Sequence, residues 1–316
     1  MRDNDFAGYG RRSAGGAPAR RRRFDDEATF LKRAPRAAPA ESTTDELDAP
    51  ETGDRWSTWD VPQAGQRGPQ PYPDWLVTEL AAVDTELGIL KTGKEADVFL
   101  LNRGVPGTAR QCLLAVKRYR SAEHRMFHRD AGYLEGRRVR ESRTTRAMQS
   151  RTGFGKEAIA GLWAAAEFGA LQGLWQVAEE LGVRPMVPYP VQIIGTELML
   201  EFIGDPVTRE AAPRLQPLRP SPDELADLWR QMYDALVVLS RCGLAHGDLS
   251  PYNLLVHDGR LVVIDLPQVV DVVANPQGRA FLARDVHNVV SWFVARGLDL
   301  DEDALSAELI REAGLR

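Results

Sequence analysis

The chain has 316 residues, of which 43% are hydrophobic and 27% charged, and its formal net charge is −5. This length holds one or two domains with a sizeable apolar core, and the negative charge argues against a general affinity for nucleic acid. The apolar runs are too short to span a bilayer, which takes about 20 residues, and the two cysteines lie far apart in sequence. We therefore expect a cytoplasmic protein without a membrane partner.

Residues 1–70 are rich in arginine, alanine and proline and show no sustained apolar periodicity, which predicts a disordered tail. The folded part is expected from residue 71. There Asp74 can cap a short helix. The apolar face of this helix would carry Trp75, Leu76, Leu80 and Val83.

Strand signals follow from residue 87. Residues 87–101 predict two strands joined by a glycine-containing turn, and residues 112–117 a third strand that ends on Lys117. A long helix is expected over 158–181. Residues 191–203 then predict a hairpin with its turn at Gly195.

The second half of the chain is predicted to be mainly helical. Helices are expected over 223–239, after a proline-rich linker, and over 279–296. Strands first and helices later predict an α+β protein of two lobes. We place the N-terminal lobe, an antiparallel sheet plus a helix, at about 71–203 and the C-terminal lobe at about 204–316.

The most informative motif is His246-Gly-Asp-Leu-Ser-Pro-Tyr-Asn253, followed by the strand Val262-Val-Ile-Asp265. Phosphoryl transfer from ATP uses such a set: an aspartate (Asp248) that orients the attacking hydroxyl, and an asparagine (Asn253) and an aspartate (Asp265) that hold a divalent metal. The alternative is a polar turn between two buried strands, in which these side chains only make turn hydrogen bonds.

Lys117 ends an apolar strand, where an ammonium needs a partner if it is buried. Glu167 is the preferred partner, because it shares one helical face with an apolar stripe. Glu157, near the expected start of the helix, is the weaker alternative. Lys117 would contact ATP phosphates if it points into a cleft, whereas a lysine that reaches back to water would have no such role.

The turn Thr92-Gly93-Lys94-Glu95 can bring backbone N–H groups and a lysine to phosphate oxygens, although a plain hairpin turn explains it equally well. The order of these motifs is that of a two-lobed kinase. A kinase of this kind would use a further set of residues to surround the adenine. Ordinary core packing would also explain the apolar or buried character of each of these residues. Met199 borders the pocket, Glu201 and Ile203 present backbone groups to the base, Val98 and Ala115 form the roof, and Leu255 forms the floor.

Three segments resemble the RIO atypical protein kinases. Residues 92–99 resemble their S/T-G-K-E-A-x-V-[FY] nucleotide loop, residues 246–253 their H-[AG]-D-L-S-x-Y-N catalytic loop, and residues 264–268 their I-D-x-x-Q metal segment. The resemblance covers roughly residues 75–297, and Arg129-Asp130 and residues 281–289 look like the first RIO subfamily. The alanine- and arginine-rich composition is typical of a bacterial source.

The resemblance implies a truncated kinase fold, without the long activation loop, that works as a serine/threonine protein kinase with autophosphorylation, as an ATPase, or as both. It implies ATP with Mg²⁺ or Mn²⁺ as cofactors. Asp248 would be catalytic, and Asn253 and Asp265 would bind the metal. Lys117 would contact the phosphates and pair with the helix glutamate, and Thr92, Lys94 and Ser250 would lie beside the phosphates.

Residues 118–156 contain eleven lysines and arginines against four acidic residues. Such a segment can contact RNA, a ribosomal partner or an acidic substrate, can hold autophosphorylation sites, or can simply be solvated.

Two other functions stay open for the chain. A small-molecule phosphotransferase of the aminoglycoside-kinase type shares the H-G-D-L-x-x-x-N loop, although only about 50 residues follow Asp265. A non-catalytic ATP-binding scaffold is the third.

Overall fold

A computed structural model describes residues 49–120 and 153–315. Its first feature is a six-stranded antiparallel sheet with the strand order β1-β2-β3-β4-β6-β5. The strands are β1 Arg55–Trp56, β2 Val83–Thr92, β3 Ala96–Gly104, β4 Gln111–Tyr119, β5 Pro190–Ile194 and β6 Glu197–Glu201. One long helix, α3 (Gly153–Glu180), packs against β4, β5 and β6.

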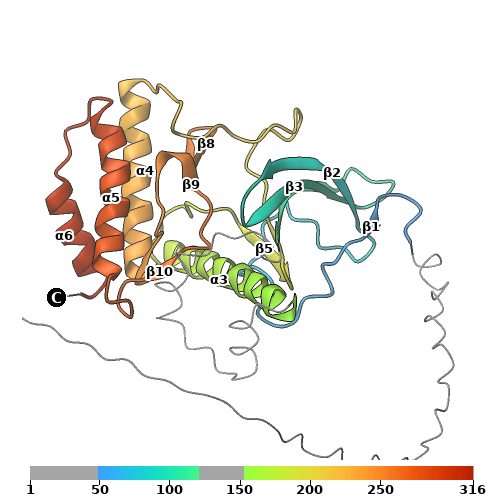
Figure 1. Cartoon of the computed structure of the whole chain (residues 1–316). Helices are drawn as coiled ribbons and strands as arrows, with labels where there is room; N and C mark the ends of the chain where they lie inside the picture. Colours follow the sequence, from blue (N-terminus) through green and yellow to red (C-terminus); the bar gives the residue numbers. More distant parts are fainter. Residues whose placement is uncertain (1–48, 121–152, 316) are drawn as a thin grey trace, which may run out of the picture. The chain divides into compact units, whose positions relative to one another are not determined.

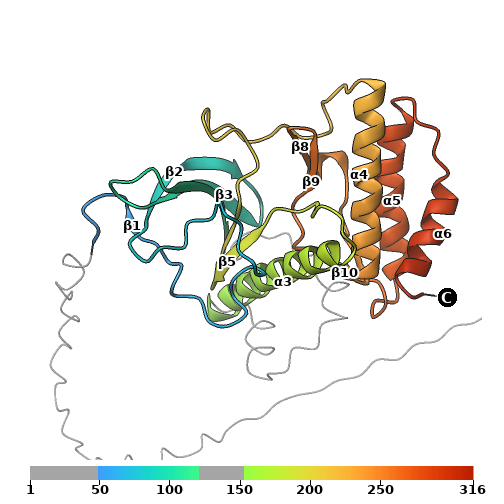
Figure 2. The same cartoon turned by 180° about the vertical axis from the view of Figure 1, so that it is seen from behind.

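Three further helices form the second lobe, namely α4 Pro222–Arg241, α5 Gly278–Val294 and α6 Glu302–Glu312. The short strands between them are β7 Leu244–Ala245, β8 Leu254–His257, β9 Arg260–Val263 and β10 Val270–Asp271. In Figures 1 and 2 these helices lie side by side, and α3 reaches from the sheet towards α4. The predicted α+β fold of two lobes is confirmed.

The folded part begins earlier in the chain than the predicted boundary at residue 70. Strand β1 pairs with β2, and the buried Trp59 packs with Leu76 and Val77 on the outer face of the sheet. Residues from about 50 onwards therefore belong to the N-terminal lobe, because they cover an apolar face that would otherwise meet water. The rest of the tail predicted over 1–70, namely residues 1–48, lies outside the described residues.

The helix predicted after Asp74 is wrong, because residues 74–82 form turns instead. Arg110 explains the difference. Its guanidinium donates to the carbonyls of Asp74 at 2.7 Å and Leu76 at 2.8 Å, which a helix would use for its own hydrogen bonds. Leu80, placed on the apolar face by the prediction, is 74% exposed.

Most other elements occur where the sequence predicts them. The hairpin of β5 and β6 turns at Gly195, whose φ of +57° lies in the left-handed region that favours glycine. Strand β4 continues past Lys117 to Tyr119, so that the lysine does not end the strand. Helix α6 is not predicted above, although Asp301 caps it by accepting the N–H of Ala304 at 2.9 Å.

Candidate active site

The predicted ion pair between Lys117 and Glu167 is present. The Nζ of Lys117 on β4 lies 3.0 Å and 2.9 Å from the two carboxylate oxygens of Glu167 on α3. Burial lowers the pKa of Lys117, but the carboxylates of Glu167 and Asp265 outweigh it and raise the pKa above its usual value. The ammonium is therefore charged at neutral pH. The side chain of Glu157, the alternative partner, lies outside the described ones.

Asp265 is the second carboxylate that contacts Lys117. Its Oδ1 lies 2.9 Å from the lysine Nζ. Burial opposes its charge, yet the lysine holds the pKa of Asp265 below its usual value, so that the carboxylate is ionised at neutral pH. The residue has a φ of +69°, a strained conformation for a residue other than glycine. Strain of this kind concentrates at functional sites.

Helix α5 fixes the backbone of the loop 246–253. The carboxylate of the buried Asp285 accepts the N–H of Gly247 at 2.8 Å and that of Leu249 at 3.0 Å. Asn288 on the same helix donates to the carbonyl of Leu249 at 2.9 Å. These bonds flank the predicted catalytic aspartate on both sides. Sequence motifs alone do not assign this role to Asp285, although it lies within the subfamily-like stretch 281–289.

Asp248 itself is exposed, whereas Gly247 and Leu249 on either side of it are buried. Asn253 donates from Nδ2 to the carbonyl of Asp248 at 2.9 Å, and its own carbonyl accepts the N–H of Ile264 at 2.9 Å. The second bond places Asn253 beside the segment that carries Asp265. Ser250, partly buried, directly precedes the 3-10 turn that contains Asn253. The fold thus brings the predicted loop and metal segment together.

Residues 92–95 form the tight turn between β2 and β3. The N–H of Gly93 donates to the carbonyl of Ala96 at 3.0 Å, and a Cβ on Gly93 would lie only 2.8 Å from that oxygen. Glycine is therefore required here. The Thr92 side chain hydrogen-bonds to Asp97, while Lys94 is exposed at the tip. The backbone is that of a hairpin turn, and phosphate contact stays a prediction.

Glu95 links this turn to the metal segment. Its side chain is hydrogen-bonded to Gln268, and its carbonyl accepts the N–H of Arg120 at 2.9 Å. Burial, and then the charge of Asp265, raise the pKa of Glu95 above its usual value. Glu95 and Gln268 belong to two sequence motifs that the fold brings together, a contact that spacing alone does not predict.

The raised pKa of Glu95 leads to a pH-dependent stability. The folded state favours the protonated Glu95 carboxyl. The contribution of Glu95 to the free energy of unfolding is therefore present below the unfolded pKa of about 4.3 and is lost as pH rises through the raised folded pKa. Glu95→Gln should therefore gain stability relative to the wild type as pH rises, as measured by urea unfolding from about pH 4 to 8. Glu79→Gln is the control, because the pKa of Glu79 is lowered and its contribution to stability should therefore change little above the unfolded pKa. A Glu95→Gln difference that is constant with pH would contradict the expectation.

Val98 and Ala115 lie on the sheet face that carries Lys117, as expected for a roof over a nucleotide. Val98 stands opposite Lys117 in the register of β3 and β4, and Ala115 is two residues before the lysine on β4. Opposite residues in neighbouring strands share a face, and so do residues two apart in one strand. The two small apolar side chains therefore border the same space as the ammonium.

The position predicted for Met199 is wrong. Met199 stands opposite Val116, on the other face of the sheet, and its sulfur lies 3.3 Å from an Arg103 guanidinium nitrogen in the outer core. Strand alternation explains the difference, since a shift of one residue changes the face. Leu200, which stands opposite Ala115, occupies the position that borders the cleft.

The connection between the lobes begins at Glu201. Its carboxylate accepts from Arg260 at 2.7 Å and from the N–H of Tyr189 at 3.0 Å, so the side chain is engaged away from the Lys117 face. Its own N–H donates to the carbonyl of Tyr189 at 2.9 Å, and contact of its backbone with the base stays a prediction. Ile203 and Leu255 belong to one small apolar cluster, as a pocket floor requires. The other members of that cluster are Ala212, Val262 and Ile264.

Two cations that the sequence analysis did not select also belong to this region. Lys91 stands opposite Val98, in the same cross-strand row as Lys117. Burial and the charge of Arg214 lower the pKa of Lys91, and the charge of Lys117 adds to this effect, while Asp265 opposes it. Arg214 belongs to the C-terminal lobe, where its backbone pairs with that of Leu255. Cations gathered in this way favour a ligand with several negative charges.

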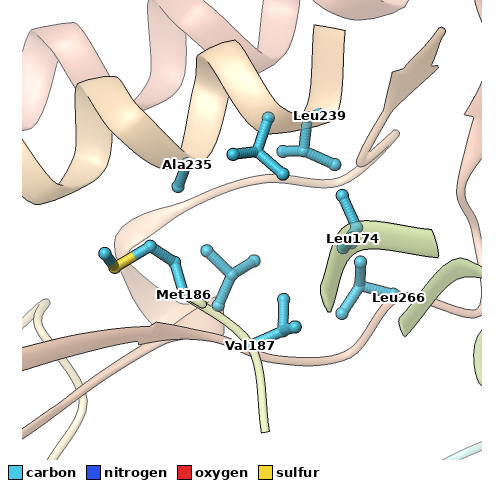
Figure 3. Close-up of a pocket in the computed structure, with 8 residues that line it drawn as sticks. Leu174, Met186, Val187, Ala235, Leu239 and Leu266 are labelled. Carbon is cyan, nitrogen blue, oxygen red and sulfur yellow. The ribbon is translucent and has the colours of Figure 1, made fainter. Parts of the chain in front are cut away.

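An apolar cavity lies directly behind the metal segment. Leu266, the residue after Asp265, points into it together with Leu174 of α3, Ala235 of α4 and Met186 (Figure 3). The lining is entirely aliphatic apart from the methionine sulfur, so the cavity offers no partner to a phosphate or a base. It therefore belongs to the core that holds Leu266, and through it Asp265, in place.

Other predictions fall on residues that the structure leaves undescribed. Most of the basic segment 118–156 and its candidate phosphorylation sites lie within the gap at 121–152. Among the described residues, no helix is long and apolar enough to cross a membrane. The same residues contain no group of three or more histidine, cysteine or acidic side chains arranged to hold a metal.

An antiparallel sheet with a lysine–glutamate pair, a helical second lobe, and a loop and metal segment facing that lysine together define a kinase-like phosphotransferase. The family model described as "RIO domain" matches residues 107–305. The chain therefore belongs to the RIO domain family and is a kinase-type enzyme, which confirms the family predicted from its motifs.

Named relatives agree with this membership. The RIO-type serine/threonine-protein kinase Rio1 of Haloferax volcanii is 37% identical over 224 residues, which cover 71% of this chain and 68% of that protein. The serine/threonine-protein kinase RIO1 of Chaetomium thermophilum is 30% identical over 68% of this chain. RIO3 of Mus musculus is 27% identical over 68% of it. The matched part spans 40% of each of these two eukaryotic proteins.

Proposed function

We propose that this chain transfers the γ-phosphoryl group of ATP to a serine or threonine hydroxyl of a protein, itself included, and hydrolyses ATP when water takes the place of that hydroxyl. One observation carries the proposal. Lys117 is buried and held between Glu167 and Asp265, beside a loop whose Asp248 is exposed. The names of the relatives supply the serine/threonine part of the proposal.

In this reaction the acceptor oxygen attacks the γ-phosphorus, the bond to the bridging oxygen breaks, and ADP leaves. Asp248 orients the hydroxyl and accepts its proton, a role that needs the exposed position this side chain has. Lys117 neutralises charge on the phosphates. It stays protonated because Glu167 and Asp265 raise its pKa.

The residues present fit a divalent metal. Asp265 is an ionised carboxylate, and Asn253 uses its amide nitrogen on the Asp248 carbonyl, which leaves the amide oxygen for another partner. Both are hard oxygen donors of the kind that Mg²⁺ and Mn²⁺ take. The bound ion would neutralise the charge that develops on the phosphates.

The remaining contacts with ATP follow from the placement of the elements. We propose that Gly93 brings the turn backbone to the phosphates, and that Thr92, Lys94 and Ser250 lie beside them. The adenine would lie between Ala115 above and Leu255 below. Glu201 and Ile203 would contact its edge through their backbones, with Leu200 rather than Met199 at the inner wall.

We propose that the kinase domain spans the described residues, and that residues 118–156 contact RNA or a ribosomal surface through their positive charge. The free cysteines Cys112 and Cys242 fit a reducing cytoplasm.

The test is incubation of the purified protein with γ-labelled ATP and Mg²⁺ or Mn²⁺, beside Asp248→Ala, Asp265→Ala and the exposed control Asp303→Ala. We expect label on serine or threonine of the wild type and the control, and a loss of roughly 10²-fold or more in the two site variants. Equal transfer and equal ATP hydrolysis in all four proteins would contradict the assignment. ATP binding without turnover would favour the scaffold, and transfer only to an added aminoglycoside would favour the small-molecule phosphotransferase.

A further inference from the structure

Tyr119 completes the hydrogen bonding of Glu167. The tyrosine hydroxyl donates to Oε2 of Glu167, the N–H of Leu266 donates to Oε1 at 3.1 Å, and Lys117 contacts both oxygens. Only 1% of Glu167 is exposed. A carboxylate offers about four acceptor sites, so these contacts occupy the whole group. Neither composition nor motif spacing singled out this tyrosine.

Tyr119 is also the more rigid of the two β4 side chains that contact Glu167. Its N–H donates to the carbonyl of Thr196 at 3.0 Å, and its ring is buried in the core. Lys117, by contrast, has a long flexible stem and divides its ammonium between two carboxylates. The ammonium lies 5.1 Å from the centroid of the tyrosine ring. The tyrosine therefore holds the acid in one place while the lysine can shift towards a ligand.

We propose that Tyr119 is a positioning residue, which fixes the carboxylate of Glu167 so that Lys117 is held where the phosphates of the nucleotide bind. This inference rests on the proposed function, because it concerns the same cleft. A positioning role predicts different effects on the binding of the phosphates and of the base, which a purely structural role does not. Loss of the hydroxyl should weaken the binding of the phosphates and leave the binding of the base unchanged.

The test compares the affinities of Tyr119→Phe for ATP and for adenosine by calorimetry. We expect the Kd for ATP to rise on the order of tenfold, the effect of losing one hydrogen bond to a charged group, while the Kd for adenosine stays within about twofold. Tyr189→Phe is the matched control. Its buried hydroxyl donates to the carbonyl of Pro69 at 2.6 Å, and its ring packs in the outer core of the same sheet.

Retained adenosine binding shows that the variant is folded around its cleft. A double-mutant cycle adds a second measurement, because the Tyr119→Phe effect should largely disappear in a Glu167→Gln background. Equal losses for ATP and adenosine, or an effect that persists in that background, would overturn the positioning role. A wild type that binds adenosine and ATP equally well, or neither, would instead overturn the proposed function.

Discussion

Lys117→Met is expected to lower phosphoryl transfer by roughly 10²–10³-fold, the typical effect of removing one group that stabilises charge in a transition state. The same change should lower the free energy of unfolding by about 3–5 kcal/mol, because it leaves Glu167 as a buried charge without its cation. Among the described residues, the hydrogen-bond donors left to that carboxylate would then be the neutral hydroxyl of Tyr119 and the N–H of Leu266.

Adding Glu167→Gln separates the two effects. The amide carries no charge and keeps an oxygen for Leu266, so the double variant Lys117→Met/Glu167→Gln should recover most of the lost stability and none of the activity. Urea unfolding and γ-labelled ATP measure the two quantities. Arg311→Met, an exposed cation removed from α6, should change neither. If the second substitution fails to restore stability, the unpaired carboxylate is not the cause of the loss.

The chemistry of the cleft could be predicted because it lies in short motifs. Asp248 and Asn253 are separated by one turn, and Asp265 follows an apolar strand, so local spacing is enough to group them. The pairing of Lys117 with Glu167 spans fifty residues in the chain, and a helical face with one carboxylate in an apolar stripe still predicted it.

Contacts that depend on side-chain direction could not be predicted. Met199 was placed on the wrong face because strand boundaries were uncertain by one residue, and one residue reverses the side of a sheet. Tyr119 resembles an ordinary core aromatic until β4 is seen to continue beyond the lysine. The turns at 74–82 depend on Arg110, a side chain from a distant hairpin, which no local pattern contains.

The largest effect on stability alone should come from a pair on the outer face of the sheet. Arg103 is fully buried and binds Asp84, itself 1% exposed, through two parallel bonds of 2.7 Å and 3.0 Å. Its remaining nitrogen donates to Gln192 at 3.2 Å. A guanidinium bound in this way supplies the positive charge and the hydrogen bonds that a carboxylate buried away from water requires. A second cation, Arg55, lies 3.7 Å from the acid, but its side chain is 38% exposed.

Arg103→Met is therefore expected to lower the free energy of unfolding by about 3–5 kcal/mol, measured by urea denaturation, because it leaves Asp84 buried without a bidentate partner. Arg230→Met, which removes an exposed pair with Asp227, should cost no more than about 1 kcal/mol. Arg103→Met/Asp84→Leu should regain much of the loss, since an apolar pair of similar volume replaces the ion pair.

Because Arg103 lies on the face opposite Lys117, the folded fraction of Arg103→Met should keep the wild-type KM for ATP. A large change in that KM, or an Arg103→Met loss no greater than that of Arg230→Met, would show that the pair does not act as a buried structural contact independent of the cleft.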